Sequence, residues 1–161
     1  ARRCCDSWNR VECRATFENS SAYYNSARDS IGMPSFHHFD TPEDFYATWC
    51  HEIIHSTGHP FRLNRLRSET PDRDAYAYEE LVAELGSYCL SRKLSITTEL
   101  KGHASYLQHW LRILRARPVI LLQVIKESQR AVSLVLRRFR QAWPREGGNF
   151  PNGPASRIQT A

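Results

Sequence analysis

The clearest hydrophobic pattern in the chain is that of an amphipathic helix from Thr41 to Thr57. With a rotation of about 100° per residue, the apolar and polar side chains separate onto two halves of the helix. The Thr-Pro start at 41–42, the acidic residues that follow it and Gly58 at the end are typical of helix boundaries. The apolar half carries Phe45, Tyr46, Trp49, Cys50, Ile53 and Ile54, and the polar half carries Thr48, His51, Glu52 and His55.

Short segments before this helix predict three strands. Apolar and polar residues alternate from Val11 to Phe17, and two more extended segments, 22–25 and 29–34, end near Gly32 and Pro34. Residues 1–10 carry little pattern. We expect a small antiparallel sheet that packs on the apolar half of the 41–57 helix.

The remainder of the chain predicts helices. One begins at Thr70-Pro71 and runs to about Leu90, a second spans 98–117 and ends at Pro118, and a third spans 119–143. Residues 144–161 are rich in Gly, Pro, Asn and Ser and are expected to be a disordered tail. The predicted fold class is therefore α+β, with one domain over residues 1–143 and a mainly helical C-terminal half.

Length and composition indicate the number of domains and the cellular compartment. A chain of 161 residues is long enough for one domain with a real core. Five cysteines without regular spacing favour a reducing compartment over a disulfide framework, and no apolar run is long enough to span a bilayer. We therefore expect a cytoplasmic protein without a membrane partner. From Leu111 onward ten Arg or Lys stand against two acidic residues, which suits contact with polyanions.

The polar half of the 41–57 helix carries the chemistry. Its sequence His51-Glu52-Ile53-Ile54-His55 places two imidazoles one turn apart, where both can bind one Zn²⁺ ion. Glu52 beside them can deprotonate a metal-bound water as general base. This motif predicts a metallopeptidase.

Catalytic zinc takes a third protein ligand, which the sequence offers in more than one place. The longer motif with a third histidine is excluded, because Phe61 occupies that position. We expect Glu80 to bind the metal and Glu84, one turn on, to orient a ligand histidine through its ring N–H. The roles of Glu80 and Glu84 could be exchanged, and Glu79 is the third choice.

The oxyanion of the reaction needs a hydrogen-bond donor besides the metal. Tyr76 shares the helix face of Glu80 and is the first candidate. Further candidates are His59, His103 and Tyr106.

Together these motifs resemble the C-terminal zincin-like metallopeptidase domain of ArdC-type antirestriction proteins. Related domains occur in TraC-type primases and phage polyvalent proteins. The resemblance runs from about residue 20 to 138 and rests on Asp29-Ser-Ile-Gly-Met-Pro34, the zinc motif followed by Ser56-Thr-Gly-His59, Arg62-Leu-Asn-Arg65, and Tyr76-Ala-Tyr-Glu-Glu-Leu-Val-Ala-Glu-Leu-Gly86.

The resemblance implies a zincin fold, a metal held by His51, His55 and a glutamate of the 79–84 segment, and Glu52 as the catalytic acid. It also implies a role on mobile elements, in protecting incoming DNA from restriction in the host cytoplasm. In the family, single-stranded DNA binding belongs to an N-terminal domain that these residues do not include. The partners expected here are thus a protein or peptide substrate and, mainly through that other domain, single-stranded DNA.

Two other functions remain open. One is a DNA- or protein-binding module with a structural or vestigial zinc, which the basic 119–143 segment supports. The other is a regulatory peptidase with a single dedicated substrate.

Overall fold

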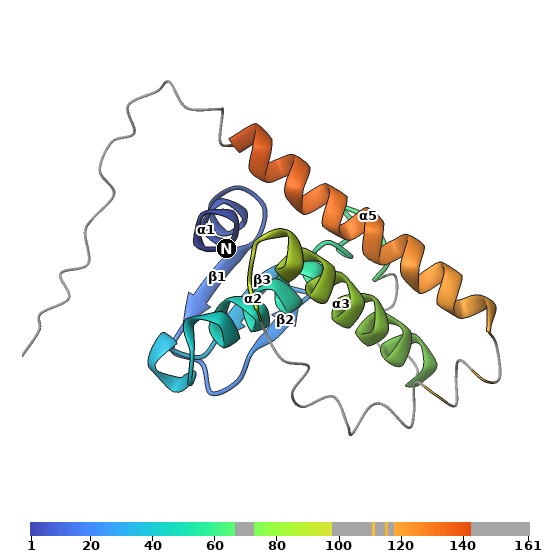
Figure 1. Ribbon diagram of the computed structural model, residues 1–161, viewed down its shortest axis with the longest axis horizontal. Coiled ribbons are helices and arrows are strands. Elements are labelled where there is room, and N and C mark those ends of the chain that lie inside the picture. Colours follow the sequence, from blue (N-terminus) through green and yellow to red (C-terminus); the bar gives the residue numbers. More distant parts are fainter. Residues whose placement is uncertain (67–72, 98–110, 112–114, 116–117, 143–161) are drawn as a thin grey trace, which may run out of the picture.

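The computed structural model describes residues 1–66, 73–97, 111, 115 and 118–142 (Figure 1). Three helices form its main body: α2 (Pro42–Ser56), α3 (Arg73–Lys93) and α5 (Val119–Ala142). Helix α3 packs against α2 on one side and against α5 on the other. A small sheet and the N-terminal helix α1 (Arg2–Val11) complete the fold at the N-terminal end of the chain.

The sheet has three short strands in the order β1-β3-β2. The strands are β1 (Arg14–Phe17), β2 (Tyr23–Asn25) and β3 (Ser30–Met33), followed by the 3₁₀ helix η1 (Phe36–His38). Strand β2 pairs antiparallel with β3, whereas β1 pairs parallel with β3. The prediction of an antiparallel sheet was therefore wrong for one pair. The chain reverses direction twice between β1 and β3, so these two strands run in the same direction. Strand β3 is the central strand, with β1 on one side and β2 on the other.

Gly32 explains how β2 and β3 approach each other. Tyr23 stands opposite Gly32 in the register of the two strands. A Cβ atom at position 32 would lie 2.5 Å from the Tyr23 ring. Only glycine therefore allows this ring to cover the central strand, on the side of the sheet that leads to the site.

No element was predicted for residues 1–10, but in the structure they form most of helix α1. Cys4, Cys5 and Trp8 form its buried face. The Trp8 indole N–H also donates to the hydroxyl of Ser56, at a distance of 2.9 Å, at the end of α2. Positions 4, 5 and 8 do have helical spacing, so the sequence carried a short amphipathic signal that the prediction missed.

Helix α2 confirms the predicted amphipathic helix. Thr41 caps its N-terminus, because the Thr41 hydroxyl accepts a hydrogen bond from the Asp44 backbone N–H at 3.1 Å. The apolar half is buried in the core through Phe45, Trp49, Ile53 and Ile54. This burial leaves the polar half, with its histidines, to face α3.

The helical C-terminal half is confirmed where the structure describes it. Helix α3 extends to Lys93, a little beyond the expected end, and α5 matches the predicted 119–143 helix closely. The expected start at Thr70-Pro71, most of the 98–117 helix and the 144–161 tail lie outside the described residues. Within the described part of the chain, no helix is both long and apolar enough to cross a bilayer.

Candidate metal centre

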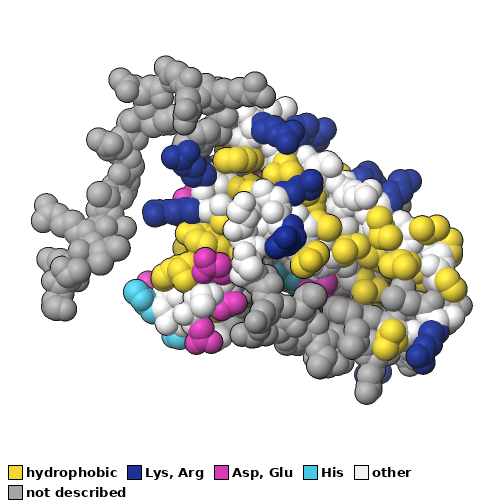
Figure 2. All heavy atoms as spheres, viewed as in Figure 1, with side chains coloured by type: hydrophobic (Ala, Val, Ile, Leu, Met, Phe, Trp, Pro, Cys, Tyr) yellow, Lys and Arg dark blue, Asp and Glu magenta, His cyan; other side chains and the backbone are white. Residues whose placement is uncertain are grey.

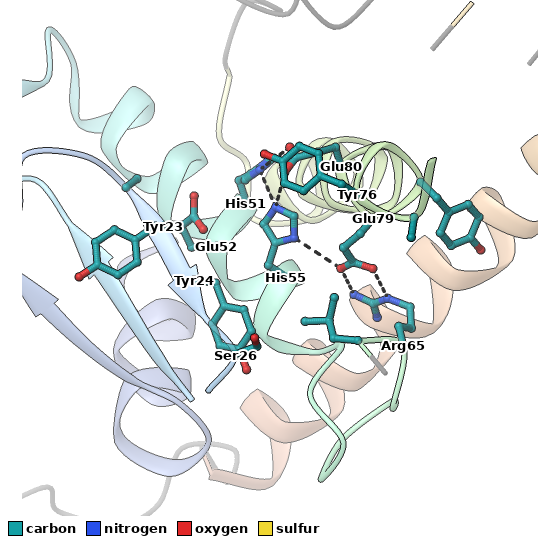
Figure 3. A pocket seen from close by; sticks show the side chains of 14 residues that line it. Tyr23, Tyr24, Ser26, His51, Glu52, His55, Arg65, Tyr76, Glu79 and Glu80 are labelled. Carbon is teal, nitrogen blue, oxygen red and sulfur yellow. Dashed lines mark hydrogen bonds and ion pairs between the residues drawn. The ribbon is translucent and has the colours of Figure 1, made fainter. Parts of the chain in front are cut away.

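Helices α2 and α3 bring three metal-ligating side chains together. The Nε2 atoms of His51 and His55 lie 3.0 Å apart. The Glu80 carboxylate approaches both, with Oε2 at 3.7 Å from His51 Nε2 and Oε1 at 3.5 Å from His55 Nε2 (Figure 3). One donor atom from each residue lies within 4.8 Å of the other two. Among the described residues, this His-His-Glu group is the one whose spacing suits a metal ion.

The far nitrogens of the two imidazoles explain how the rings are oriented. The Nδ1 atom of His51 lies 3.7 Å from Glu84 Oε1, and the Nδ1 atom of His55 lies 3.4 Å from Glu79 Oε1. A carboxylate opposite Nδ1 favours the ring form with its proton there. Both Nε2 lone pairs then point at each other and at Glu80. Two imidazole nitrogens and a carboxylate that converge in this way form a ligand set that fits a divalent cation.

Glu52 lies next to this group but is not part of it. The side chain is buried and lines the same cavity, on the side of the histidine pair that faces Tyr23 (Figure 3). Burial raises the pKa of Glu52 to about 7, the nearby His55 opposes the rise, and Glu80 and Glu84 add to it. A carboxylate with that pKa can exchange a proton near neutral pH.

The cavity lined by the His-His-Glu group has a volume of about 710 Å³ and is open to solvent. It lies between β2 and the start of α3, and tyrosines contribute much of its wall. Tyr76, the expected oxyanion donor, lines the cavity and is half exposed. The lining tyrosines are Tyr23, Tyr24, Tyr76 and Tyr78.

The other candidate donors are placed differently. His59 is buried away from the residues that line the cavity, and its Nδ1 accepts the Phe61 backbone N–H at 3.3 Å. His103 and Tyr106 lie outside the described residues. Tyr76 is therefore the candidate that the structure brings to the site.

Two arginines that support the site were not identified from the sequence. Arg62 donates to the Asp29 carboxylate through two nitrogens, to the Ser56 carbonyl at 2.6 Å and to the Glu12 carbonyl at 3.1 Å. Arg65 forms a bidentate pair with Glu79, at 2.8 and 3.0 Å. In the sequence both belonged to a polar connection after Gly58, and their spacing in Arg62-Leu-Asn-Arg65 was the available signal.

The electrostatics of His55 and Glu79 reflect these contacts. Burial alone would lower the pKa of His55, but the hydrogen bond to Glu79 and the surrounding carboxylates raise it overall. For Glu79, burial raises the pKa, and the contacts with His55 and Arg65 lower it by more. Glu79, the third choice as a ligand, thus lies behind His55 as a carboxylate held by Arg65.

Comparisons with known proteins show the family of this chain. A family model of zincin-like metallopeptidase domains matches residues 7–127. The DNA primase TraC of Escherichia coli is 34% identical over 119 residues, which cover 74% of this chain and 11% of the primase. The uncharacterized protein y4eC of Sinorhizobium fredii is 33% identical over 111 residues, 68% of this chain and 36% of that protein.

Two crystal structures of the antirestriction protein ArdC from the R388 plasmid have the same fold. The Mn(II)-bound structure superposes on this chain with a TM-score of 0.76 at 34% sequence identity. The match covers 84% of this chain and 51% of the ArdC chain. The metal-free structure gives a TM-score of 0.75 at 33% identity, covering 85% of this chain and 50% of that chain. This chain thus spans about half the length of ArdC and a far smaller part of TraC. By its fold, its His-His-Glu group and these similarities, the chain belongs to the family of zincin-like metallopeptidase domains found in ArdC-type proteins.

Proposed function

We propose that this domain is a zinc-dependent peptidase. His51, His55 and Glu80 would hold the metal, and Glu52 would act as general base. The observation that carries the proposal is the position of Glu52, a buried carboxyl group in the same cavity as the three converging donors. Two imidazoles and one carboxylate are a donor set typical of catalytic zinc, so we favour zinc over the Mn(II) that the ArdC structure contains.

The residues of the site divide the work of peptide hydrolysis. When bound, zinc supplies a water of lowered pKa and a Lewis acid for the scissile carbonyl. Glu52 takes a proton as that carbonyl is attacked and returns it to the leaving amine. Glu84 holds the imidazole ring of His51 through Nδ1. Tyr76 donates a hydrogen bond to the oxygen that becomes negative.

The biological setting is also part of the proposal. The relatives include a protein named for antirestriction and one named a DNA primase. We infer that the peptidase acts in the host cytoplasm and helps incoming DNA of a mobile element to survive. The substrate would be a protein or peptide of the host that threatens this DNA.

Metal analysis tests the ligands first. We expect one zinc per chain in the wild type, loss of zinc in Glu80→Ala and weakened zinc binding in Glu84→Ala. The reverse order for the two variants would exchange their roles. A full zinc content in both variants would mean that neither Glu80 nor Glu84 is the third ligand.

Cleavage of a proteome-derived peptide library, read by mass spectrometry, tests the reaction. Wild type is expected to cut within a restricted sequence context, and Glu52→Gln to bind zinc but not to cut. Identical cleavage by wild type and Glu52→Gln would exclude Glu52 as the base. Wild-type zinc binding without any cleavage would favour the second candidate function below.

That second candidate is a binding module for nucleic acid, and one feature of α5 favours it. Four basic residues of α5 are exposed and share one helix face, within about 40° of its centre. Lys and Arg side chains gather over the C-terminal half of α5 in Figure 2. Among the described residues, only one of the four, Arg130, has a carboxylate partner, Glu127 at 2.7 Å. The four are Lys126, Arg130, Arg137 and Arg140.

Binding of single-stranded DNA at several salt concentrations tests this candidate. A phosphate-binding face predicts affinity that falls steeply with salt. It also predicts that Arg137→Glu combined with Arg140→Glu weakens binding, whereas Arg92→Glu combined with Lys93→Glu, at two exposed basic residues of α3, does not. If the α5 and α3 variants weakened DNA binding equally, the binding would depend on net charge and not on this face of α5.

A further inference from the structure

Behind His55, on the side away from the metal centre, lies a buried pair of opposite charges. The side chains of Arg65 and Glu79 are 5% and 10% exposed. Two nitrogens of the guanidinium donate to the two carboxylate oxygens, Nη2 to Oε1 at 2.8 Å and Nε to Oε2 at 3.0 Å. The same Oε1 atom lies 3.4 Å from His55 Nδ1 (Figure 3).

We propose that Arg65 and Glu79 are positioning residues that fix the ring of His55 for metal binding. This inference rests on the metal centre proposed above. Glu79 accepts from Nδ1–H, so the Nε2 lone pair of His55 is left for the metal. Arg65 holds the Glu79 carboxylate at that place and in that orientation.

The geometry of Arg65 shows why it can do this. Besides Glu79 on α3, its guanidinium donates to the Thr57 hydroxyl at 2.9 Å and to the Ile54 carbonyl at 3.0 Å. Both of these acceptors lie within two residues of His55 on or next to α2. A planar guanidinium fork has a fixed geometry. The position of the carboxylate is therefore defined relative to the backbone that carries the histidine.

The pair could instead be only a clamp between α2 and α3, and the two roles predict different results. A clamp affects folding and leaves the electronic state of the His55 ring unchanged. A positioning pair changes the strength of the hydrogen bond at Nδ1 and, through the ring, the affinity for metal. Partners of this kind typically account for about 10–100-fold in metal affinity.

Zinc affinity, measured by competition with a fluorescent chelator, tests the proposal. Glu79→Gln is the main variant, because the amide keeps the shape and an acceptor but loses the charge. We expect it to weaken zinc binding by about 10–100-fold. Arg65→Met should weaken zinc binding too, and the double variant should lose little more than Glu79→Gln alone, because both changes interrupt one chain of contacts.

Glu12→Gln is the matched control. Glu12, which follows α1, is 11% exposed and forms a 2.8 Å pair with Arg138 of α5. This variant therefore also removes the charge of a largely buried, arginine-paired glutamate, but one that forms none of the described ion pairs of His51 and His55. Zinc affinity should be unchanged in this variant. Thermal melts of the metal-free proteins establish that every variant folds.

A spectroscopic measurement separates positioning from clamping. Ring ¹H–¹⁵N correlation spectra of the zinc-loaded protein report the Nδ1–H proton of His55. We expect this proton to move upfield in Glu79→Gln, because a neutral acceptor forms a weaker hydrogen bond than a carboxylate. An unmoved ring signal, or zinc affinity within about twofold of wild type, would overturn the proposal while the metal centre stands.

Two other results would also count against it. Equal loss of zinc in Glu12→Gln would mean that removing the charge of any arginine-paired glutamate has this effect. Absence of zinc from the wild type would overturn the proposed function, and the positioning role with it.

Discussion

Arg62 joins the segment after α2 to the sheet, and its replacement by Met tests how strongly that junction supports the pocket. The guanidinium reaches Asp29 just before β3, the Ser56 carbonyl at the end of α2 and the Glu12 carbonyl after α1. Asp29 in turn accepts a hydrogen bond from the hydroxyl of Tyr24, at 2.8 Å. Met retains most of the apolar stem but provides none of the donors.

The expected cost follows from what the variant leaves behind. Removal of one partner of a buried ion pair typically destabilises a protein by about 3–5 kcal/mol. The Asp29 side chain is 27% exposed, so water can solvate the carboxylate that loses its partner. We therefore expect the lower end, about 3 kcal/mol in the free energy of unfolding. For a chain of this length that corresponds to a fall of about 6–12 °C in Tm.

Denaturant unfolding followed by tryptophan fluorescence measures this cost. Arg138→Met is the control, because Arg138 also pairs with a carboxylate, that of Glu12, but is itself 44% exposed, and exposed pairs contribute about 0–1 kcal/mol. In an Asp29→Asn background, Arg62→Met should lower the free energy of unfolding by less than in wild type, because the asparagine carries no charge that could be left unpaired. A loss no larger than that of Arg138→Met would refute the view that Arg62 anchors the pocket wall.

Three further predictions concern stability. Burial raises the pKa of Asp29, but its bonds with Arg62 and Tyr24 lower it below its ordinary value of 3.8. The carboxylate thus contributes stability above about pH 4 that is lost as the pH falls through the lowered pKa, and Asp29→Asn should flatten unfolding curves measured across that range. Thr41→Ala removes the N-cap of α2 and should cost about 1 kcal/mol in denaturant unfolding, whereas Thr41→Ser should not. In Gly86→Ala the new Cβ would lie 2.8 Å from Ile54, so we expect net destabilisation and weaker zinc binding despite the better helix propensity of alanine; a more stable variant would contradict this.

The sequence predicted the parts of this molecule that are encoded locally. Helix α2 combines a period of 3.6 residues, a cap and a metal motif within one short segment, and each of these depends on neighbours three or four residues away. The E-E-x-x-x-E pattern of α3 is equally local. Which glutamate binds the metal stays a prediction, and the structure contributes the finding that Glu80 is the one whose carboxylate approaches both Nε2 atoms.

The parts that the sequence did not predict depend on distant partners. Arg62 and Asp29 are 33 residues apart, and Arg65 and Glu79 are 14 residues apart, so neither buried pair has a local signature. An arginine-rich connection looks like a solvated loop until its partners are known. The parallel pairing of β1 with β3 has the same origin, because alternation predicts strands but not their neighbours.

The three glutamates of α3 show how one helix can serve both histidines of another. His51 faces Glu84 and His55 faces Glu79, so the two helices run antiparallel where they meet, and Glu80 approaches both rings. All three contacts depend on the separation of α2 from α3. Gly86 sets that separation, because its missing side chain lets Ile54 of α2 approach the backbone of α3. The metal centre is therefore a property of the helix interface as much as of the motif on α2, and a change that widens the interface should weaken metal binding even when every ligand is retained.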